Sequence, residues 1–249
     1  MEKIWREYQF KVNGLFEQIR YNQATIDKLF IPFLKRLTDL QRLDNRRVIV
    51  FIVAAPATGK STLTLFFEKL SREIDELIPV QAVGMDGFHY RSDFIKTHSI
   101  IRDGKSIPMS AVKGCPETFD VEKISEKLSA LKNSDTKFPI YDRKIHDVID
   151  DALEVTGKII LFEGNWLLLK DQNWKNLRRF ADYALMIKSD PFLLRDRLIN
   201  RKIQGGLSLK EATEFYECSD GRNVERVLHD SDIADETWHM LNDNDYVAE

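Results

Sequence analysis

The feature that most constrains the fold is a run of seven apolar residues, Val48–Ala54, followed directly by the sequence APATGKST at residues 55–62. A short, continuous apolar run is typical of a strand buried on both faces of a parallel sheet. Apolar residues at helical spacing then indicate a helix: Leu63, Phe66, Phe67, Leu70 and Ile74. The sequence therefore predicts a strand, a tight loop and a helix in immediate succession, which is the context of a phosphate-binding loop.

This loop matches the pattern G-x-x-x-x-G-K-[ST] except at its first position, where Ala54 replaces glycine. Because alanine disfavours positive φ, the loop must begin in a conformation that Ala54 accepts. Backbone N–H groups and the helix start can hold phosphate oxygens. We therefore expect a nucleotide to bind at Ala55, Pro56, Ala57, Thr58, Gly59, Lys60, Ser61 and Thr62. Lys60 would reach the β- and γ-phosphates, and the Ser61 hydroxyl would be a Mg²⁺ ligand. The alternative is an ordinary strand–turn–helix with a solvated lysine.

Strands and helices alternate along the rest of the chain. Strands are expected at residues 80–85, 158–162 and 183–188, and helices at residues 120–132 and 190–204. The second of these helices opens with Asp190 and Pro191, a capping residue followed by a proline in the first turn. This alternation predicts an α/β protein with three layers, in which helices cover a mostly parallel central sheet.

Residues 1–45 have a different pattern and predict an N-terminal addition to a single domain at residues 46–249. Asn13-Gly14 lies between extended apolar segments and favours a β-hairpin, since both residues tolerate positive φ. Apolar residues then recur at helical spacing around Pro32, which is expected to kink this helix or divide it in two. The addition could shield a sheet edge, mediate a homodimer or help close a substrate pocket, and the sequence leaves these three open.

Composition excludes some partners. The 37 basic and 40 acidic side chains give a formal charge of −3, so nothing in the overall charge favours nucleic acid or a membrane surface. Two cysteines are too few for a disulfide framework, which favours a reducing compartment. The N-terminus lacks the apolar core of a signal peptide, and no apolar run approaches the ~20 residues needed to span a bilayer. We therefore expect a soluble, cytoplasmic protein.

Two carboxylates follow predicted strands. Asp86 comes directly after the strand at residues 80–85, and Glu163 after the strand at residues 158–162. The carboxyl ends of parallel strands are where such sheets bind ligands. Asp86 could orient an acceptor hydroxyl and take its proton, while Glu163 could complete the Mg²⁺ environment through a coordinated water. A plain Asp-Gly turn and a glutamate that caps a turn are the alternatives.

A cluster of basic residues lies in the helix at residues 190–204. Arg197 and Arg201 share one helical face, and Gly205-Gly206 follows as a candidate hinge. A lid of this kind would bring guanidinium groups to a migrating phosphoryl group and exclude water. Taken alone, the cluster is better explained as a charged helix surface.

The ordered set APATGKST, MDGFH, GCPETFD, PIYDRKIHD, ILFEGNW and RDRLINRK resembles the superfamily of P-loop kinases that includes uridine kinase, phosphoribulokinase and bacterial pantothenate kinase. The resemblance spans about residues 46–230 and looks closest to a poorly characterised bacterial and fungal branch of sugar or nucleoside kinases. It implies the P-loop NTPase fold with a helical lid, Asp86 as the catalytic base, and Arg197 and Arg201 as lid arginines.

The same resemblance suggests an acceptor site. In uridine kinases an aromatic residue and a histidine five positions apart contact the acceptor, and Tyr141 and His146 match that spacing. His89, close to Asp86, could line the same pocket or be a structural hydrogen-bonding group. The MDGFH motif is not of the uridine kinase type, so uridine itself is not favoured as the acceptor.

Together these features predict an ATP-dependent, Mg²⁺-using kinase that phosphorylates an alcohol on a sugar, a nucleoside or a pantothenate-like acid. A regulatory nucleotide-binding NTPase and an inactive kinase-like module are the alternatives. The sequence lacks the Asn-Lys-x-Asp motif with which a GTPase switch would read guanine. An inactive module is opposed by the intact residues Lys60, Ser61, Asp86 and Glu163.

Overall fold

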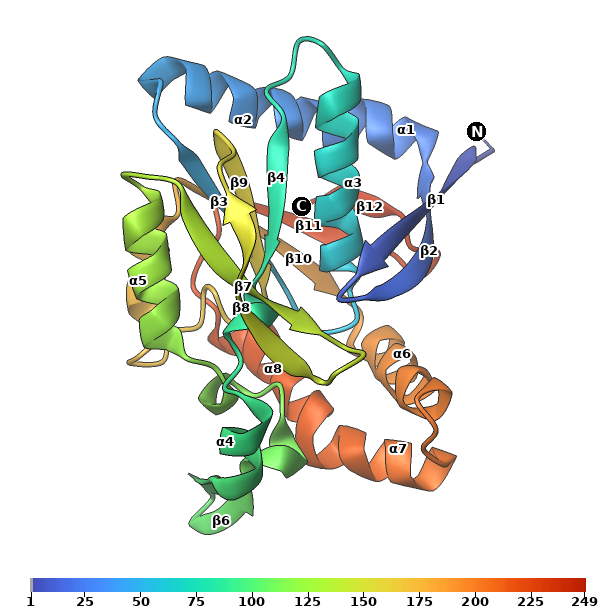
Figure 1. Cartoon of the computed structure of the whole chain (residues 1–249). Helices are drawn as coiled ribbons and strands as arrows, with labels where there is room; N and C mark the ends of the chain where they lie inside the picture. The colour runs from blue at the N-terminus through green and yellow to red at the C-terminus, as the bar shows by residue number, and fades with distance from the viewer. Residues whose placement is uncertain (1) are drawn as a thin grey trace.

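The computed structural model describes residues 2–249, and a six-stranded sheet lies at its centre (Figure 1). In spatial order the strands are β12 (Tyr246–Ala248), β11 (Glu236–Met240), β10 (Tyr183–Ser189), β3 (Val48–Ala54), β9 (Ile159–Gly164) and β4 (Val80–Gly84). All neighbouring pairs are parallel except β11 and β12. β3 lies between β10 and β9 with all seven residues buried, which explains its continuous apolar sequence.

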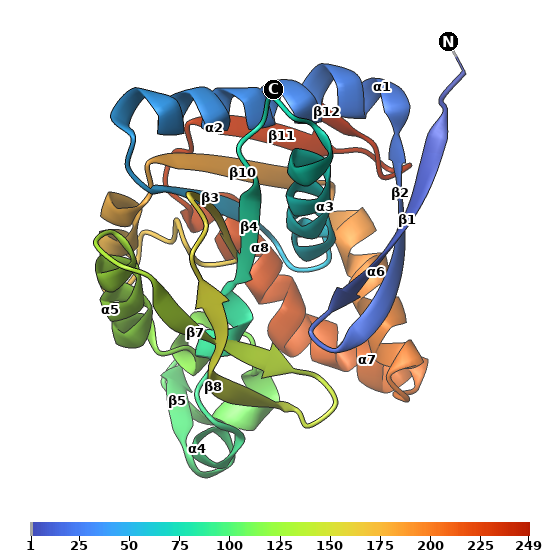
Figure 2. The same cartoon turned by 45° about the horizontal axis from the view of Figure 1, so that its top comes forward.

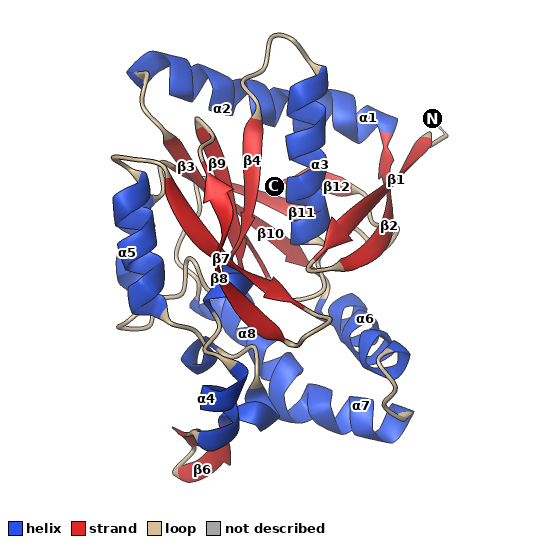
Figure 3. Cartoon of the chain, in the orientation of Figure 1, coloured by secondary structure: helices blue, strands red, loops and turns tan. Residues whose placement is uncertain are grey.

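Helices and three hairpins surround this sheet (Figure 3). The α-helices are α1 (Gln23–Thr25), α2 (Ile31–Asp44), α3 (Lys60–Glu73), α4 (Ser92–Thr97), α5 (Val121–Leu131), α6 (Pro191–Gln204), α7 (Leu209–Phe215) and α8 (Gly221–Asp230). The hairpins pair β1 (Trp5–Val12) with β2 (Leu15–Asn22), β5 (Ser99–Arg102) with β6 (Lys105–Pro108), and β7 (Thr136–Asp142) with β8 (Asp147–Val155). Short helical turns are η1 (Ile26–Phe30), η2 (Met85–Phe88), η3 (Met109–Val112), η4 (Pro116–Thr118), η5 (Lys175–Phe180) and η6 (Tyr216–Asp220).

The register of the strands shows how the two faces of the sheet are covered. Side chains alternate along a strand, so Trp238 of β11 and Phe51 of β3 point to opposite faces. Trp238 packs with aromatic residues of η1, α2 and α3, namely Phe30, Phe33 and Phe67. On the other face, Phe51 packs on Phe162, which in turn contacts Phe88 of η2 and Phe138 of β7. The predicted three-layer α/β architecture is therefore confirmed.

The predicted strands at residues 80–85, 158–162 and 183–188 correspond to β4, β9 and β10, and the predicted helices at residues 120–132 and 190–204 to α5 and α6. Asp120 and Asp190 cap these helices through their side chains. The hairpins β5–β6 and β7–β8 and the last two strands were not predicted.

The N-terminal hairpin forms as predicted, with Asn13 at φ 49° and Gly14 at φ 90°. Pro32 does not divide the helix that follows. It lies in the first turn of α2, and the chain before it forms the π-helical turn η1, in which the Ile31 N–H donates to the Ile26 carbonyl. Proline has no N–H to donate to the preceding turn of a helix. The wider π-helical turn before Pro32 is one way for the chain to tolerate this missing hydrogen bond. The predicted boundary near residue 45, between the N-terminal addition and the domain at residues 46–249, stays a prediction. Tyr21 and other residues of the N-terminal segment belong to the main hydrophobic core.

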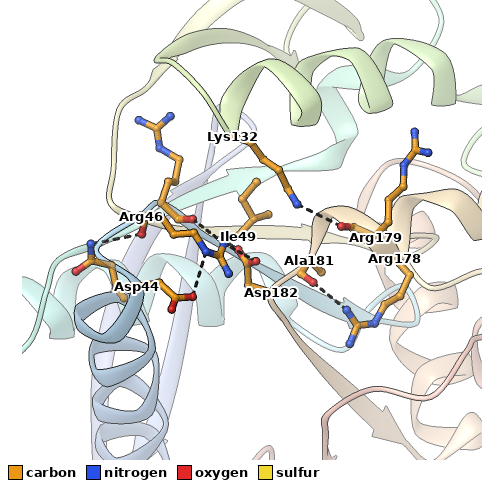
Figure 4. A network of polar contacts seen from close by, with 10 residues as sticks. Asp44, Arg46, Ile49, Lys132, Arg178, Arg179, Ala181 and Asp182 are labelled. Carbon is orange, nitrogen blue, oxygen red and sulfur yellow. Dashed lines mark hydrogen bonds and ion pairs between the residues drawn. The ribbon is translucent and has the colours of Figure 1, made fainter.

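A polar network ties the amino ends of the strands together (Figure 4). Asp182, just before β10, accepts a hydrogen bond from the Ile49 N–H at 2.8 Å, and its other oxygen pairs with Arg46 at 2.7 Å. Arg46 also contacts Asp44 at the end of α2. These contacts fix the end of the sheet opposite to the phosphate loop. No helix within residues 2–249 is long and apolar enough to cross a membrane.

Asp245, a buried carboxylate, joins the N-terminal segment to the C-terminal strands. It accepts hydrogen bonds from Asn22 Nδ2 at 2.9 Å and Thr25 Oγ1 at 2.5 Å, and its Oδ2 lies 2.9 Å from Lys3 Nζ. Burial raises the pKa of Asp245, but the hydrogen bonds from Thr25, Lys3 and Asn22 outweigh it, so the pKa lies below its ordinary value.

We expect Asp245→Ala to lower the free energy of unfolding at pH 7 by about 2–4 kcal/mol, because it leaves buried donors without an acceptor. Because the pKa of Asp245 is lower in the folded than in the unfolded state, its contribution to stability is fully present above the unfolded-state pKa of ~3.9. That contribution is lost as the pH falls from ~3.9 through the folded-state pKa. Urea denaturation at pH 7 and at lower pH measures both effects. Asp243→Ala is the control, since Asp243 also pairs with Lys3 but is exposed, and should change stability by less than ~1 kcal/mol. Equal losses in the two variants would contradict the role given to Asp245.

Candidate active site

The loop between β3 and α3 has the geometry of a phosphate-binding site. Thr58 Oγ1 donates to the Ala55 carbonyl at 2.9 Å, and Thr62 Oγ1 donates to the Gly59 carbonyl at 2.7 Å. Gly59 adopts φ 81° and α3 begins at Lys60, so the first N–H groups of the helix have no intrahelical acceptor. A helix start with free N–H groups and no carboxylate in its first turn suits an anion.

The missing first glycine is accommodated as expected, because Ala54 is the last residue of β3 and does not have a positive φ. The strained alanine of this loop is Ala57, which adopts φ 68°. A left-handed conformation costs a non-glycine residue about 1–2 kcal/mol. Arg197 of α6 contacts the strained position, since its Nη1 donates to the Ala57 carbonyl at 2.9 Å.

Glu163, at the end of β9, lies beside the loop. Its Oε1 accepts a hydrogen bond from Ser61 Oγ at 2.6 Å, and its Oε2 lies 3.9 Å from Lys60 Nζ. Glu163 as a whole is only 7% exposed. Burial raises the pKa of Glu163, an effect that the charge of Lys60 opposes and that of Asp86 reinforces.

These groups fit Mg²⁺, which prefers hard oxygen ligands and is usually held by one or two carboxylates together with substrate phosphates and water. Ser61 and Glu163 supply a hydroxyl and a carboxylate that already contact each other. Within residues 2–249, no group of three or more His, Cys, Asp or Glu is placed to hold a metal ion without such additional ligands.

Asp86 lies in η2, just beyond β4, the neighbour of β9. Its Oδ2 accepts a hydrogen bond from Asn13 Nδ2 at 3.1 Å. Burial raises the pKa of Asp86, but the nearby charges of His89, Lys60 and Arg143 and the bond from Asn13 outweigh it. The pKa of Asp86 therefore lies below its ordinary value, and the group is ionised at neutral pH.

His89, also beyond β4, lies close to Asp86. Its Nδ1 lies 2.9 Å from the Asp86 carbonyl, which can only accept, so Nδ1 carries the proton of this bond. Burial lowers the pKa of His89, and the charge of Asp86 opposes the change. The His89 ring packs on Phe119 at 3.8 Å, and its centroid lies 5.6 Å from that of Tyr141.

The structure brings Tyr141 but not the His146 ring into this group. Tyr141, in β7, accepts a hydrogen bond from Lys113 Nζ at 2.9 Å. His146 lies in the β7–β8 turn at φ 54°, and its side chain is exposed. Its carbonyl accepts from Ser92 Oγ at 2.6 Å, so in this structure the backbone of His146 is engaged rather than its ring.

Arg197 and Arg201, the two arginines predicted to belong to a lid, have different surroundings. Arg197 is half-buried against the phosphate loop and also donates to Asn244 Oδ1. Burial lowers the pKa of Arg197. Arg201 lies one turn further along α6 and is exposed. Gly205 ends α6, and Gly206 has φ 101°, so the chain turns sharply between α6 and α7.

Comparison with known proteins places this chain in a superfamily. No family model matches the sequence. The uncharacterized protein YggC of Escherichia coli is 41% identical over 239 residues, which cover 96% of this chain and 97% of YggC. A protein of Schizosaccharomyces pombe provisionally named a uridine kinase is 28% identical over 76% of this chain and 83% of its own length. The pantothenate kinase of Lactococcus lactis is 27% identical over 78% of this chain but only 61% of its own length.

Among solved structures, a protein from Silicibacter sp. provisionally described as a fructose transport system kinase superposes with a TM-score of 0.68. It is 27% identical and covers 81% of this chain and 98% of that one. This chain belongs to the P-loop kinase superfamily that includes uridine kinase, phosphoribulokinase and pantothenate kinase. The P-loop kinase fold predicted from the sequence is thereby confirmed, and the relatives support P-loop nucleotide binding. The individual loop residues assigned to the nucleotide stay predictions.

In this member of the P-loop kinase superfamily, several polar residues near the candidate site were not predicted from the sequence to belong to it. Asn13 contacts Asp86, and Asn244 contacts Arg197, but each lies far from its partner in the sequence. Lys113 lies next to the GCPETFD motif and could have been found there. Among the described residues, six buried polar side-chain atoms lack a hydrogen-bond partner, and one of them, Asn165 Oδ1, belongs to the residue that directly follows β9.

Proposed function

We propose that this protein is an ATP-dependent kinase that phosphorylates a hydroxyl group of a small metabolite. The observation that carries the proposal is the convergence of Lys60, the Ser61–Glu163 pair and Asp86 at the carboxyl ends of β3, β9 and β4. A nucleotide site alone requires the loop and its lysine. An ionised carboxylate on the neighbouring strand is the additional group that transfer to an alcohol requires.

In this proposal the backbone N–H groups of the loop at residues 55–62, all except Pro56, which has none, bind the ATP phosphates. Lys60 neutralises charge on the β- and γ-phosphates. Ser61 and Glu163 would hold Mg²⁺, which when bound stabilises the negative charge of the phosphates. Arg197, already at the loop, and Arg201, one helical turn away, would stabilise the migrating phosphoryl group when the lid closes.

Asp86 would orient the acceptor hydroxyl and accept its proton as the new O–P bond forms to the γ-phosphorus. The bond from the γ-phosphorus to the β–γ bridging oxygen would break in the same step, and ADP would leave. His89, Tyr141 and His146 would bind the rest of the acceptor. The proximity of the His89 and Tyr141 rings supports this assignment, and His146 would need its exposed ring to turn toward the acceptor. The acceptor class is a sugar, a nucleoside or a pantothenate-like acid, in keeping with the names of the relatives.

The proposal is tested by ADP release with Mg²⁺-ATP and a panel of sugars, nucleosides and pantothenate. We expect at least one acceptor to raise turnover 10-fold or more above basal ATP hydrolysis. Lys60→Ala should abolish this increase because it removes the cation at the phosphates. Lys69→Ala replaces a partly exposed lysine of the same helix that pairs with Glu73, and it should leave the increase intact. If no acceptor raises turnover in the wild type, a regulatory NTPase or an inactive kinase-like module becomes the better description.

A further inference from the structure

The turn of the N-terminal hairpin contacts the catalytic side of the kinase core. Asn13 Nδ2 donates to Asp86 Oδ2 at 3.1 Å, and the Asn13 carbonyl accepts from the Arg143 N–H at 3.0 Å. Glu17 Oε1 of β2 pairs with Arg143 Nη1 at 3.2 Å. Figures 1 and 2 show the hairpin running beside α3, with its turn near the β7–β8 hairpin. The hairpin therefore bridges Asp86 and the strand that carries Tyr141.

The body of the hairpin is anchored on α3. Tyr8 of β1 and Tyr21 of β2 pack on Phe66, with ring centroids 4.7 Å and 4.5 Å apart. Tyr21 is 1% exposed. Because α3 begins at the phosphate-binding Lys60, the same helix sets the positions of the hairpin and of the ATP-binding loop. Asn13 therefore lies in the turn of a hairpin whose strands are packed on α3, which fixes its position relative to the ATP-binding loop.

The contact has a chemical consequence for Asp86. A carboxylate has two oxygens, and a donor fixed on Oδ2 restricts rotation of the group and leaves Oδ1 for an acceptor hydroxyl. The amide of Asn13 is uncharged at any pH, so it stabilises the ionised carboxylate without adding a proton of its own. Lys60, Glu163, His89 and Arg143 are the charged or titratable groups whose fields also act on Asp86.

We propose that the N-terminal hairpin is part of the acceptor site of this kinase, and that Asn13 is a positioning residue that holds the Asp86 carboxylate for the acceptor hydroxyl. The role rests on the proposed function. It gives the N-terminal addition one of the three roles that its sequence left open, which is to complete the acceptor pocket.

The competing explanation is that Asn13 is present only for the backbone of the turn, since Asn-Gly is a preferred type I′ pair. Asn13→Gly separates the two explanations, because glycine keeps the turn conformation and removes the amide. The β5–β6 hairpin offers a matched control. Its two-residue turn is Asp103-Gly104, with φ 52° and 73°, so Asp103→Gly makes the same backbone change in a turn that does not contact Asp86.

We expect Asn13→Gly to lower kcat for acceptor phosphorylation about 10-fold or more, because Asp86 is no longer held, while KM for ATP changes less than twofold. Asp103→Gly should leave kcat within twofold. If Asn13 had a purely structural role, Asn13→Gly and Asp103→Gly would lower stability to a similar extent. In that case Asn13→Gly would not lower kcat selectively while leaving KM for ATP unchanged. An Asn13→Gly enzyme with kcat within twofold of an active wild type would overturn the positioning role and leave the proposed function standing.

A second measurement does not depend on turnover. Unfolding of the wild type, Asn13→Gly, Asp86→Ala and the double variant forms a double-mutant cycle, and we expect a coupling of about 10-fold in the unfolding equilibrium constant. Coupling indistinguishable from unity would overturn the contact on which the proposal rests. If the wild type phosphorylates no acceptor, the proposed function fails, and with it the catalytic role of Asn13, whatever the cycle shows.

Discussion

Replacing Asp86 by asparagine is expected to lower kcat for acceptor phosphorylation by about 10²- to 10⁴-fold, the range typical for loss of a general base. The substitution keeps the size and shape of the side chain but removes its capacity to take a proton. Asn13 Nδ2 can still donate to the amide oxygen that replaces Oδ2, so the local structure should persist. Steady-state ADP release with the acceptor found in the panel measures the effect.

ATP binding should be nearly unchanged in Asp86→Asn, because the loop and Lys60 are untouched, and the loss should therefore fall on kcat rather than on KM for ATP. Asp93→Asn is the matched control, since Asp93 is an exposed aspartate in the first turn of α4. A folded Asp86→Asn enzyme whose kcat is within threefold of the wild type would reject Asp86 as the base.

The parts of this fold that could be predicted are those determined by local patterns. Val48–Ala54 is apolar throughout because both faces of β3 are covered, and a buried central strand leaves that signature in any sequence. The convergence of Asp86 and Glu163 was predictable for a related reason. Parallel neighbours end at the same edge of the sheet, so carboxylates that follow two such strands are brought close by the architecture itself.

The parts that could not be predicted depend on contacts between distant segments. Asn13 lies 73 positions from Asp86, and its sequence signal is fully accounted for by the φ values of a type I′ turn. Nothing local indicates that its amide has a second partner. The left-handed backbone conformation of Ala57 could not be predicted from the motif, because the motif specifies glycine at the position of Ala54 and leaves position 57 open. β11 was missed because Glu236–Met240 mixes polar residues with its buried Trp238 and gives no clear strand periodicity.

Replacing Gly87 by alanine is expected to destabilise the protein by about 3 kcal/mol and to impair catalysis as well. Gly87 does not have a positive φ, so its backbone conformation does not require glycine. An added Cβ would lie 2.1 Å from the carbonyl oxygen of Pro139 in β7. A backbone atom cannot move aside as a flexible side chain can, so either β7 or η2 must shift. Because Asp86 is the residue before Gly87, a shift of η2 by about 1 Å could lower kcat ~10²-fold.

Gly104→Ala separates this close approach from the general effect of replacing glycine. Gly104 has φ 73° but no atom within 4 Å of its added Cβ, so the substitution should cost about 1 kcal/mol through backbone strain alone and leave kcat unchanged. Urea denaturation and ADP release on both variants measure the two effects. If Gly87→Ala were as stable and as active as Gly104→Ala, β7 would not be packed against η2 as closely as the structure has it. Asp86 would then be held in place by its contacts with Asn13 and His89 rather than by the packing of η2 against β7.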